Sequence, residues 1–203
     1  RADLNIPIAV ALQVNSALFV WPEVENDNVA FTVSRYEIDG SGGVEDVARL
    51  NAGDNGGIGL YQTFPVLSAG ADGGYASAWF QSESVDEKKV FSQRIQYINA
   101  DGSAGAAATI GEDPLDILSG DIDMASDRDG AFLIGWTVSE NGEPRYRKVT
   151  AFDEEGVIEP PATIVSKSDL GLYDASDNTR VALSDDLAVV AWYEQADGNS
   201  GPV

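Results

Sequence analysis

Short apolar runs separated by Gly, Asp and Asn recur along the whole chain. In the segment GGYASAWFQ (73–81), neither of the two alternating sets of side chains carries a charge. Side chains on a strand point alternately to its two faces, so this segment predicts a strand that is buried on both sides. No part of the chain shows the 3.6-residue spacing of apolar positions that predicts a helix.

The apolar runs form an internal repeat. Each of four similar runs ends at or next to a tryptophan, and the four tryptophans are almost equally spaced along the chain. The runs are NSALFVW ending at Trp21, GGYASAWF around Trp79, DGAFLIGWT around Trp136 and DDLAVVAWY around Trp192. A second shared element lies upstream of each run, at 10–12, 68–70, 125–127 and 181–183. Two strands joined by a tight turn account for each pair of elements.

Further strands are predicted downstream in the first three repeats. Runs that end in an acidic-Gly turn lie at 33–40, 95–102 and 149–156, and short fourth strands lie at 48–50, 108–110 and 162–164. The repeat units are approximately 1–57, 58–115, 116–172 and 173–203, the last being incomplete. Each full unit therefore has four short strands joined by Gly- and Asp-rich turns.

Four strands and one tryptophan per unit predict an all-β fold, a β-propeller segment of about 3.5 four-stranded blades. Strands between neighbouring blades need apolar residues on both faces. The residue before each tryptophan is small in three of four units, as expected if the large ring on one face of the strand is matched by a shallow surface on the other face. These residues are Val20, Ala78, Gly135 and Ala191. Core packing is therefore favoured over sugar stacking as the role of Trp21, Trp79, Trp136 and Trp192.

The second unit carries a more specific pattern, which runs DGG, AW, QR and then an acidic-Gly turn within residues 71–105. The matching residues are Asp72, Gly73, Gly74, Ala78, Trp79, Gln93, Arg94, Asp101 and Gly102. This pattern resembles the blade repeat of bacterial extracellular β-propeller proteins. At the place of Arg94 the first unit has Thr32 and the third has Lys148. The resemblance implies a propeller architecture and an exported or cell-surface location, more than any single activity.

The repeats do not add up to a closed ring. A unit assembled from the two ends of the chain would still lack nearly half of its residues. This favours a fragment of a larger ring, and the start at Arg1 without a methionine suggests that a preceding segment was removed or not included. The alternative is that residues 2–4 supply the outer strand of the last blade and close a four-bladed ring.

Composition and charge narrow the classes of partner. The 203 residues include 43% hydrophobic residues, enough for a buried core, and 34 acidic against 12 basic residues give a net charge of −22. Nucleic-acid binding needs clustered cations and is excluded as a partner class. No apolar run approaches the ~20 residues that span a bilayer, so membrane insertion is not expected.

The chain contains neither Cys nor His, which excludes thiol and imidazole catalysis and the metal sites that these ligands form. Carboxylates remain, and they are densest in GDIDMASDRDG (120–130), where Asp121, Asp123, Asp127 and Asp129 could hold calcium. The segment does not fit an EF-hand loop, because Ala125 and Trp136 occupy ligand places. A turn role is the simpler interpretation for Asp129, which precedes Gly130 as Asp72 precedes Gly73.

Catalysis by a carboxylate pair, as in glycoside hydrolysis, requires two acids facing each other. Aligning the repeats places Ile8, Val66, Asp123 and Thr179 at equivalent positions of the strands expected to line a central channel. Asp123 is the single acid of this set, and Arg180 is a charge partner for it. The sequence therefore favours a protein that is not an enzyme.

A binding or structural module that recognises protein or glycan is the favoured function. Its working surface would be formed by long loops at one end of the blades, 82–89 and 166–178, with Tyr173, Tyr193 and Arg180 as contact residues. Two alternatives stay open. One is a carbohydrate-active propeller enzyme, and the other is an assembly subunit whose propeller is completed by another copy or another chain through strand addition.

Overall fold

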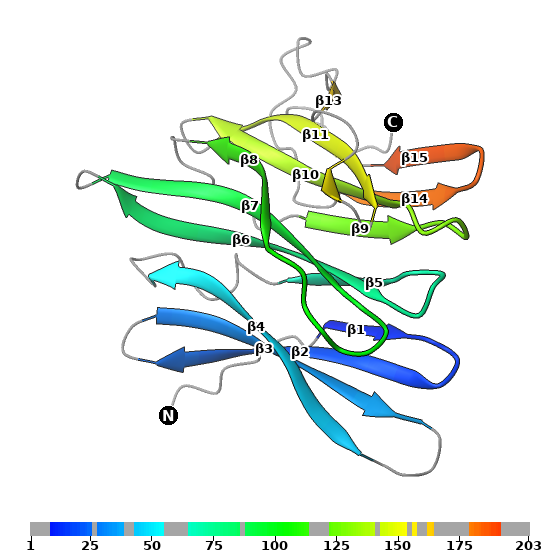
Figure 1. Cartoon of the computed structure of the whole chain (residues 1–203). Coiled ribbons are helices and arrows are strands. Elements are labelled where there is room, and N and C mark those ends of the chain that lie inside the picture. Colours follow the sequence, from blue (N-terminus) through cyan, green and yellow to red (C-terminus); the bar gives the residue numbers. More distant parts are fainter. Residues whose placement is uncertain are drawn as a thin grey trace, which may run out of the picture.

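The computed structural model describes residues 9–25, 28–38, 43–54, 65–85, 88–113, 122–140, 143–153, 156–157, 162–164 and 179–191. These residues form β-strands joined by turns, and none of them lies in a helix (Figure 1). The chain is therefore an all-β protein, as its sequence predicts.

The strands fall into four groups that follow one another along the chain, here called units 1 to 4. Within each unit, strands that are neighbours in the chain pair antiparallel. Unit 1 contains β1 (Ala9–Leu12), β2 (Ser16–Glu25), β3 (Asn28–Glu37) and β4 (Val44–Asp54). Unit 2 contains β5 (Val66–Ala69), β6 (Tyr75–Val85), β7 (Lys88–Ile98) and β8 (Ala108–Asp113).

Unit 3 begins with β9 (Ile122–Ser126), β10 (Phe132–Glu140) and β11 (Glu143–Asp153). Its fourth strand is split into β12 (Gly156–Val157) and β13 (Ala162–Ile164), which both pair with β11. Unit 4 is described as one hairpin, β14 (Arg180–Ser184) and β15 (Leu187–Ala191). The four groups lie within the four repeat units of the sequence.

The first strands of the units lie next to one another. β1 contacts β5, β5 contacts β9, and β9 contacts β14 (Figure 1). The other strands of each unit extend outward from this row, and β4 and β6 share a parallel bridge between Gly53 and Ser82. This arrangement stacks the units face to face, so each internal unit needs apolar side chains on both sides of its sheet.

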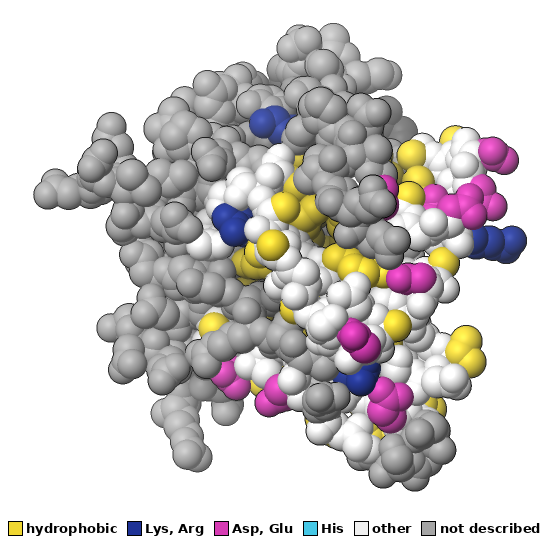
Figure 2. Space-filling model, viewed as in Figure 1, with side chains coloured by type: hydrophobic (Ala, Val, Ile, Leu, Met, Phe, Trp, Pro, Cys, Tyr) yellow, Lys and Arg dark blue, Asp and Glu magenta, His cyan; other side chains and the backbone are white. Residues whose placement is uncertain are grey.

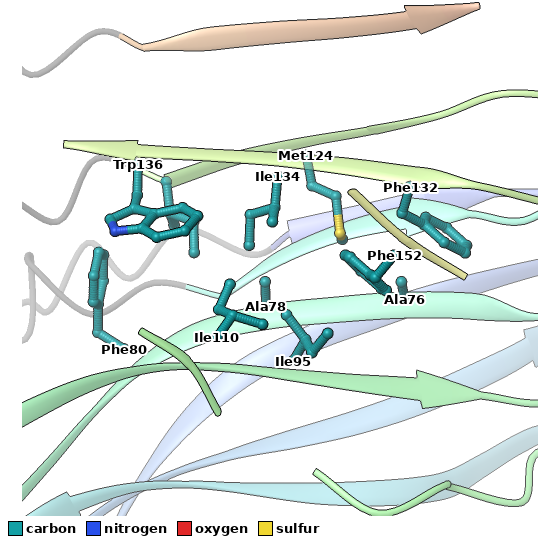
Figure 3. Close-up of a cluster of buried hydrophobic side chains, with 11 residues drawn as sticks. Ala76, Ala78, Phe80, Ile95, Ile110, Met124, Phe132, Ile134, Trp136 and Phe152 are labelled. Atoms are coloured by element: carbon teal, nitrogen blue, oxygen red, sulfur yellow. The ribbon is translucent and has the colours of Figure 1, made fainter. Parts of the chain in front are cut away.

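The two apolar cores lie between successive units. The core between units 1 and 2 contains Leu18, Val20, Phe31 and Val33 from unit 1 and Tyr75, Trp79 and Ile98 from unit 2. The core between units 2 and 3 contains Ala76, Ala78, Phe80, Ile95 and Ile110 from unit 2 and Met124, Phe132, Ile134, Trp136 and Phe152 from unit 3 (Figure 3). The uncharged faces of the segment 73–81 thus serve two different cores.

The tryptophans share an orientation where they are described. Trp79 lies in the core with unit 1 and Trp136 in the core with unit 2, so each ring faces the preceding unit. Both side chains are buried, whereas Trp21 in unit 1 is partly exposed. Trp192 lies outside the described residues.

Gly135 shows why a small residue precedes a tryptophan. A Cβ atom at Gly135 would lie 2.7 Å from Cγ1 of Val181 in unit 4, closer than carbon atoms pack. The face of unit 3 opposite to Trp136 therefore touches unit 4 through backbone at this point. Units 3 and 4 also meet through the hydroxyls of Thr137 and Thr179, whose oxygen atoms are 3.1 Å apart.

The structure corrects the sequence alignment of the first strands. Val66 and Asp123 pair with the residues before Trp79 and Trp136, as expected. In units 1 and 4, however, the paired residues are Ala9 and Arg180 rather than Ile8 and Thr179. The turn that follows the first strand is one residue shorter in these two units, which shifts the register by one.

The segment 82–89 is also different from the expected loop. β6 continues to Val85 and β7 begins at Lys88, so most of the segment is a paired hairpin. Backbone pairing continues here because it does not require apolar side chains. The other proposed loop, 166–178, lies outside the described residues.

Candidate functional site

The turns between the first two strands of the units lie at one edge of the molecule, here called the turn edge. It comprises residues 13–15, 70–74, 127–131 and 185–186. In Figure 1 these hairpin turns project to the right, and Figure 2 shows Asp, Glu, Lys and Arg side chains on the same side of the molecule. The row of first strands brings turns from successive repeats, which are far apart in sequence, into proximity.

The turn of unit 2 is built around Asp72. One carboxylate oxygen, Oδ1, accepts a hydrogen bond from the backbone N–H of Gly74 at 3.0 Å, and Oδ2 accepts one from the hydroxyl of Tyr97 at 2.6 Å. Gly73 has φ +97°, a conformation that favours glycine. The Tyr97 hydrogen bond is the main cause that lowers the pKa of Asp72 below its ordinary value of 3.8. Asp72 is therefore ionised at neutral pH and acts as an acceptor.

The turn of unit 3 is built around Asp127. Its Oδ1 accepts hydrogen bonds from the backbone N–H groups of Asp129 and Ala131, both at 2.9 Å. Gly130 has φ +89°, close to that of Gly73. These bonds fix the turn and leave the side chains of Arg128 and Asp129 exposed.

Two clefts open at the turn edge, and Arg128 lines both. The first has a volume of about 500 Å³, lies between units 2 and 3, and is lined by Asp72, Tyr97, Arg128, Asp129 and Asp153 among others. The second, of about 550 Å³, lies between units 3 and 4 and is lined by Asp127, Arg128, Leu183, Asp185 and Asp186 among others. The two clefts that share Arg128 are thus lined by carboxylate residues from three units.

Side-chain hydrogen bonds tie the units together near the turn edge. Gln13 of unit 1 donates from Nε2 to the carbonyl oxygens of Gly70 at 2.9 Å and Gly74 at 2.7 Å in unit 2. Ser126 of unit 3 donates to the carbonyl oxygen of Ala69 in unit 2 at 2.6 Å. Hydrogen bonds near the turn edge therefore bridge the boundary between units 1 and 2 and the boundary between units 2 and 3.

Of the aspartates proposed as calcium ligands, Asp123 lies apart from Asp127 and Asp129, which share one turn. Oδ2 of Asp123 accepts the backbone N–H of Val181 at 2.9 Å, which ties β9 to β14. Asp123 lies within β9 and Asp127 directly after it, about 13 Å away at the rise of a strand, so one ion cannot bind both directly. Asp121 lies outside the described residues. Within the described ranges, no group of three or more acidic side chains is arranged to hold a metal ion.

The proposed ligand-contact residues are only partly described. Arg180 is exposed at the start of β14, the end opposite to the turn edge, and its Nη1 donates to the carbonyl oxygen of Thr179 at 2.7 Å. Tyr173 and Tyr193 lie outside the described residues. The proposed contact set is therefore not brought together with the clefts by the part of the structure that is described.

Sequence reasoning missed the cleft residues Asp72, Tyr97, Arg128, Asp153 and Asp185 as a group. Asp72 was assigned to turn formation, and the DRDG turn to turn formation or calcium binding; the turn role is found for Asp72 and Asp127. The sequence feature that could have indicated these residues is the high density of charged residues in the turns between the first two strands of each unit. The repeat places these turns on one edge of the molecule. The contributions of β7 and β11 come from the far ends of long strands and have no local signature.

Among the described residues, no helix has the length and apolarity needed to cross a membrane.

Comparison with known proteins leaves the family open. No family model and no curated protein matches the chain. One similar solved structure is the crystal structure of the GH43_1 enzyme from Xanthomonas citri complexed with xylose, with 11% sequence identity. The match covers 98% of this chain and 91% of that chain, with a TM-score of 0.46. A likeness this weak decides neither the activity nor the ligand of this chain.

Proposed function

We propose that the chain is a β-propeller segment of an exported or cell-surface protein, and that its turn edge binds a neutral glycan without cleaving it. The observation that carries the proposal is the pair of adjoining clefts that share Arg128. The repeated four-stranded units with adjacent first strands support the propeller architecture. The acidic composition and the repeat pattern of residues 71–105 support the exported location.

The chemistry of the clefts fits a ligand rich in hydroxyl groups. The carboxylate of Asp129 can accept hydrogen bonds from hydroxyls, and the guanidinium of Arg128 can donate to ring and hydroxyl oxygens. The volumes, about 500 and 550 Å³, are within the usual range for small-molecule sites of about 300–1,000 Å³. A neutral ligand is favoured because a chain with net charge −22 repels anions.

The lowered pKa of Asp72 argues against Asp72 as the general acid of a hydrolysis. A glycosidase needs one carboxyl group with a raised pKa, so that it holds a proton for the leaving group. Asp72 lies in the cleft between units 2 and 3, and its pKa is shifted downward by the Tyr97 hydroxyl. Its Oδ1 and Oδ2 are also occupied by Gly74 and Tyr97, as expected for a residue that holds the turn.

Glycan binding can be tested with a panel of neutral oligosaccharides, followed by titration calorimetry on the best ligand. Arg128→Ala is expected to weaken binding about 10-fold or more, since it removes the donor common to both clefts; a 10-fold loss corresponds to about 1.4 kcal/mol. Asp129→Asn should also weaken binding. Asp101→Asn is the matched control for Asp129→Asn, because Asp101 is exposed and lies outside the two clefts.

Three outcomes would contradict this function. One is the absence of binding to any neutral oligosaccharide, and another is wild-type affinity in both cleft variants. Release of new reducing ends from the bound oligosaccharide would show that the chain is an enzyme. Repeating the titration with calcium and with a chelator tests the calcium prediction separately, since a calcium-dependent site would lose affinity in the chelator.

A further inference from the structure

Unit 1 exposes an apolar face that units 2 and 3 bury. Cross-strand partners share a face of a sheet, so Val10, Leu12, Ala17, Phe19, Trp21, Tyr36 and Val44 lie on one side of unit 1, here called the Trp21 face. The opposite side, with Leu18 and Val20, packs on unit 2. On the Trp21 face, Leu12 is 67% exposed and Val44 is 66% exposed.

The equivalent positions in units 2 and 3 show what this face lacks. Tyr36 pairs with the residue four before Trp21, as Ile98 and Phe152 pair with the residues four before Trp79 and Trp136. Tyr36 is 37% exposed, whereas Ile98 is 0% and Phe152 is 1% exposed. Ile98 and Phe152 are covered by the preceding unit. The Trp21 face thus corresponds to the faces of units 2 and 3 that pack on a preceding unit, but Tyr36 at its matching position is more exposed.

The matching half is exposed at the other end of the row. Val189 lies three residues before Trp192, as Leu18, Ala76 and Leu133 lie three residues before their tryptophans. These three side chains are 0%, 0% and 5% exposed, but Val189 is 45% exposed. Leu187, which is on the same side of the β14–β15 hairpin, is 62% exposed. We call this surface the Val189 face.

We propose that the Trp21 face is a docking surface for a second copy of this chain, which covers it with its own Val189 face. The contact would repeat the packing between successive units. There, the sheet face opposite to the tryptophan of one unit packs on the tryptophan-bearing face of the next unit. Because the two faces differ, the contact is head-to-tail, and two such contacts related by a two-fold axis close a ring. Two copies of about 3.5 blades give about seven, within the usual range of four to eight blades.

Charge predicts how this association responds to salt. Each copy carries a net charge of −22, so two copies repel each other at low ionic strength. Salt shortens the Debye length from about 10 Å at 0.1 M to about 3 Å at 1 M, while apolar contact is not weakened. The fraction of paired copies should therefore rise with salt concentration.

Light scattering coupled to size-exclusion chromatography tests the proposal on the whole chain of 203 residues. At 1 M salt the expected mass is twice the 21.5 kDa of one copy. Leu12→Glu and Val189→Glu should each restore the monomer mass at this salt concentration. Val14→Glu is the matched control, because Val14 is 92% exposed in a turn and should leave the pair intact.

Mixing the two variants separates this contact from others. A Leu12→Glu copy keeps its Val189 face and a Val189→Glu copy keeps its Trp21 face, so an equimolar mixture should form pairs although neither variant pairs alone. A monomer at every salt concentration would overturn the proposal. A second contradicting result is that Leu12→Glu abolishes pairing whereas Val189→Glu leaves it intact. This result would indicate a symmetric contact between two Trp21 faces. If the protein is a monomer and Leu12→Glu lowers its free energy of unfolding, the ring closes within one chain. That result would also overturn the proposal.

Discussion

Replacement of Trp136 by alanine is expected to lower the free energy of unfolding by about 3–5 kcal/mol. Trp136 is 1% exposed and lies in the core between units 2 and 3, beside Phe80 and Ile110 (Figure 3). Removing its ring leaves a cavity that two apposed sheets can close only by shifting relative to each other. Urea unfolding followed by circular dichroism measures the change without relying on the fluorescence of the deleted ring.

Trp21→Ala is the control for this prediction. Trp21 holds the same place in the repeat, but its side chain is partly exposed because no unit precedes it in the described part of the chain. We expect Trp21→Ala to lower the free energy of unfolding by less than half as much as Trp136→Ala does. Both variants are measured at low salt, where copies of the chain repel each other. Equal losses of unfolding free energy in the two variants would contradict the role of Trp136 as a core side chain between two units.

Gly74→Ala is expected to lower the free energy of unfolding by about 3 kcal/mol, at the upper end of the usual cost of overpacking. A Cβ atom at this position would lie 2.1 Å from the hydroxyl oxygen and 2.5 Å from Cζ of Tyr97, and 3.0 Å from the carbonyl oxygen of Ile98. The Tyr97 ring would have to move, and its hydrogen bond to Asp72 would be lost. Thermal unfolding should show a melting temperature lower by about 6–12 °C.

Two further variants test the cause of this loss. Gly105→Ala should be nearly neutral, since its Cβ atom would meet only the carbonyl oxygen of Tyr97 at 3.4 Å. Tyr97→Leu removes the obstacle, so Gly74→Ala should cost clearly less in that background than in the wild type. An unchanged cost in the Tyr97→Leu background would show that the ring is not what makes glycine necessary at position 74.

The repeat made much of the fold predictable. Four almost equally spaced tryptophans predict four similar units, and the turns around Gly73 and Gly130 are found where DGG and DRDG predict them. These features are local, because an apolar run and a positive-φ glycine have the same consequences in every unit. The all-β class followed from the same pattern.

Strand register and strand length were harder to predict from the sequence. A one-residue difference in the turn moves Ala9 and Arg180 into the place assigned to Ile8 and Thr179, and the repeat spacing alone does not reveal it. The hairpin through 82–89 continues on backbone pairing, with no apolar alternation to mark it. In both cases the outcome depends on turn length and on backbone pairing, which the spacing of the tryptophans does not show.

The clefts could not be derived from the sequence, since their residues come from different units. Asp72 and Arg128 belong to successive turns, and Asp153 lies at the end of β11. Their proximity depends on the lateral packing of β5 and β9, which is a tertiary feature. The sequence predicted Asp123 to be a carboxylate that lines the channel. In the structure its carboxylate accepts a hydrogen bond from a backbone N–H group of β14.

The side-by-side packing of the first strands is the central claim, and a disulfide across it is the most direct test. Oγ of Ser68 on β5 and Oγ of Ser126 on β9 are 3.0 Å apart, and the chain has no cysteine of its own. The variant carrying Ser68→Cys and Ser126→Cys should oxidise to an intramolecular disulfide, seen by intact mass at low protein concentration. Ser68→Cys with Ala125→Cys should not, because Ala125 points to the other face of β9. Failure of the first pair to cross-link, or equal cross-linking in both, would contradict the stacking of units 2 and 3.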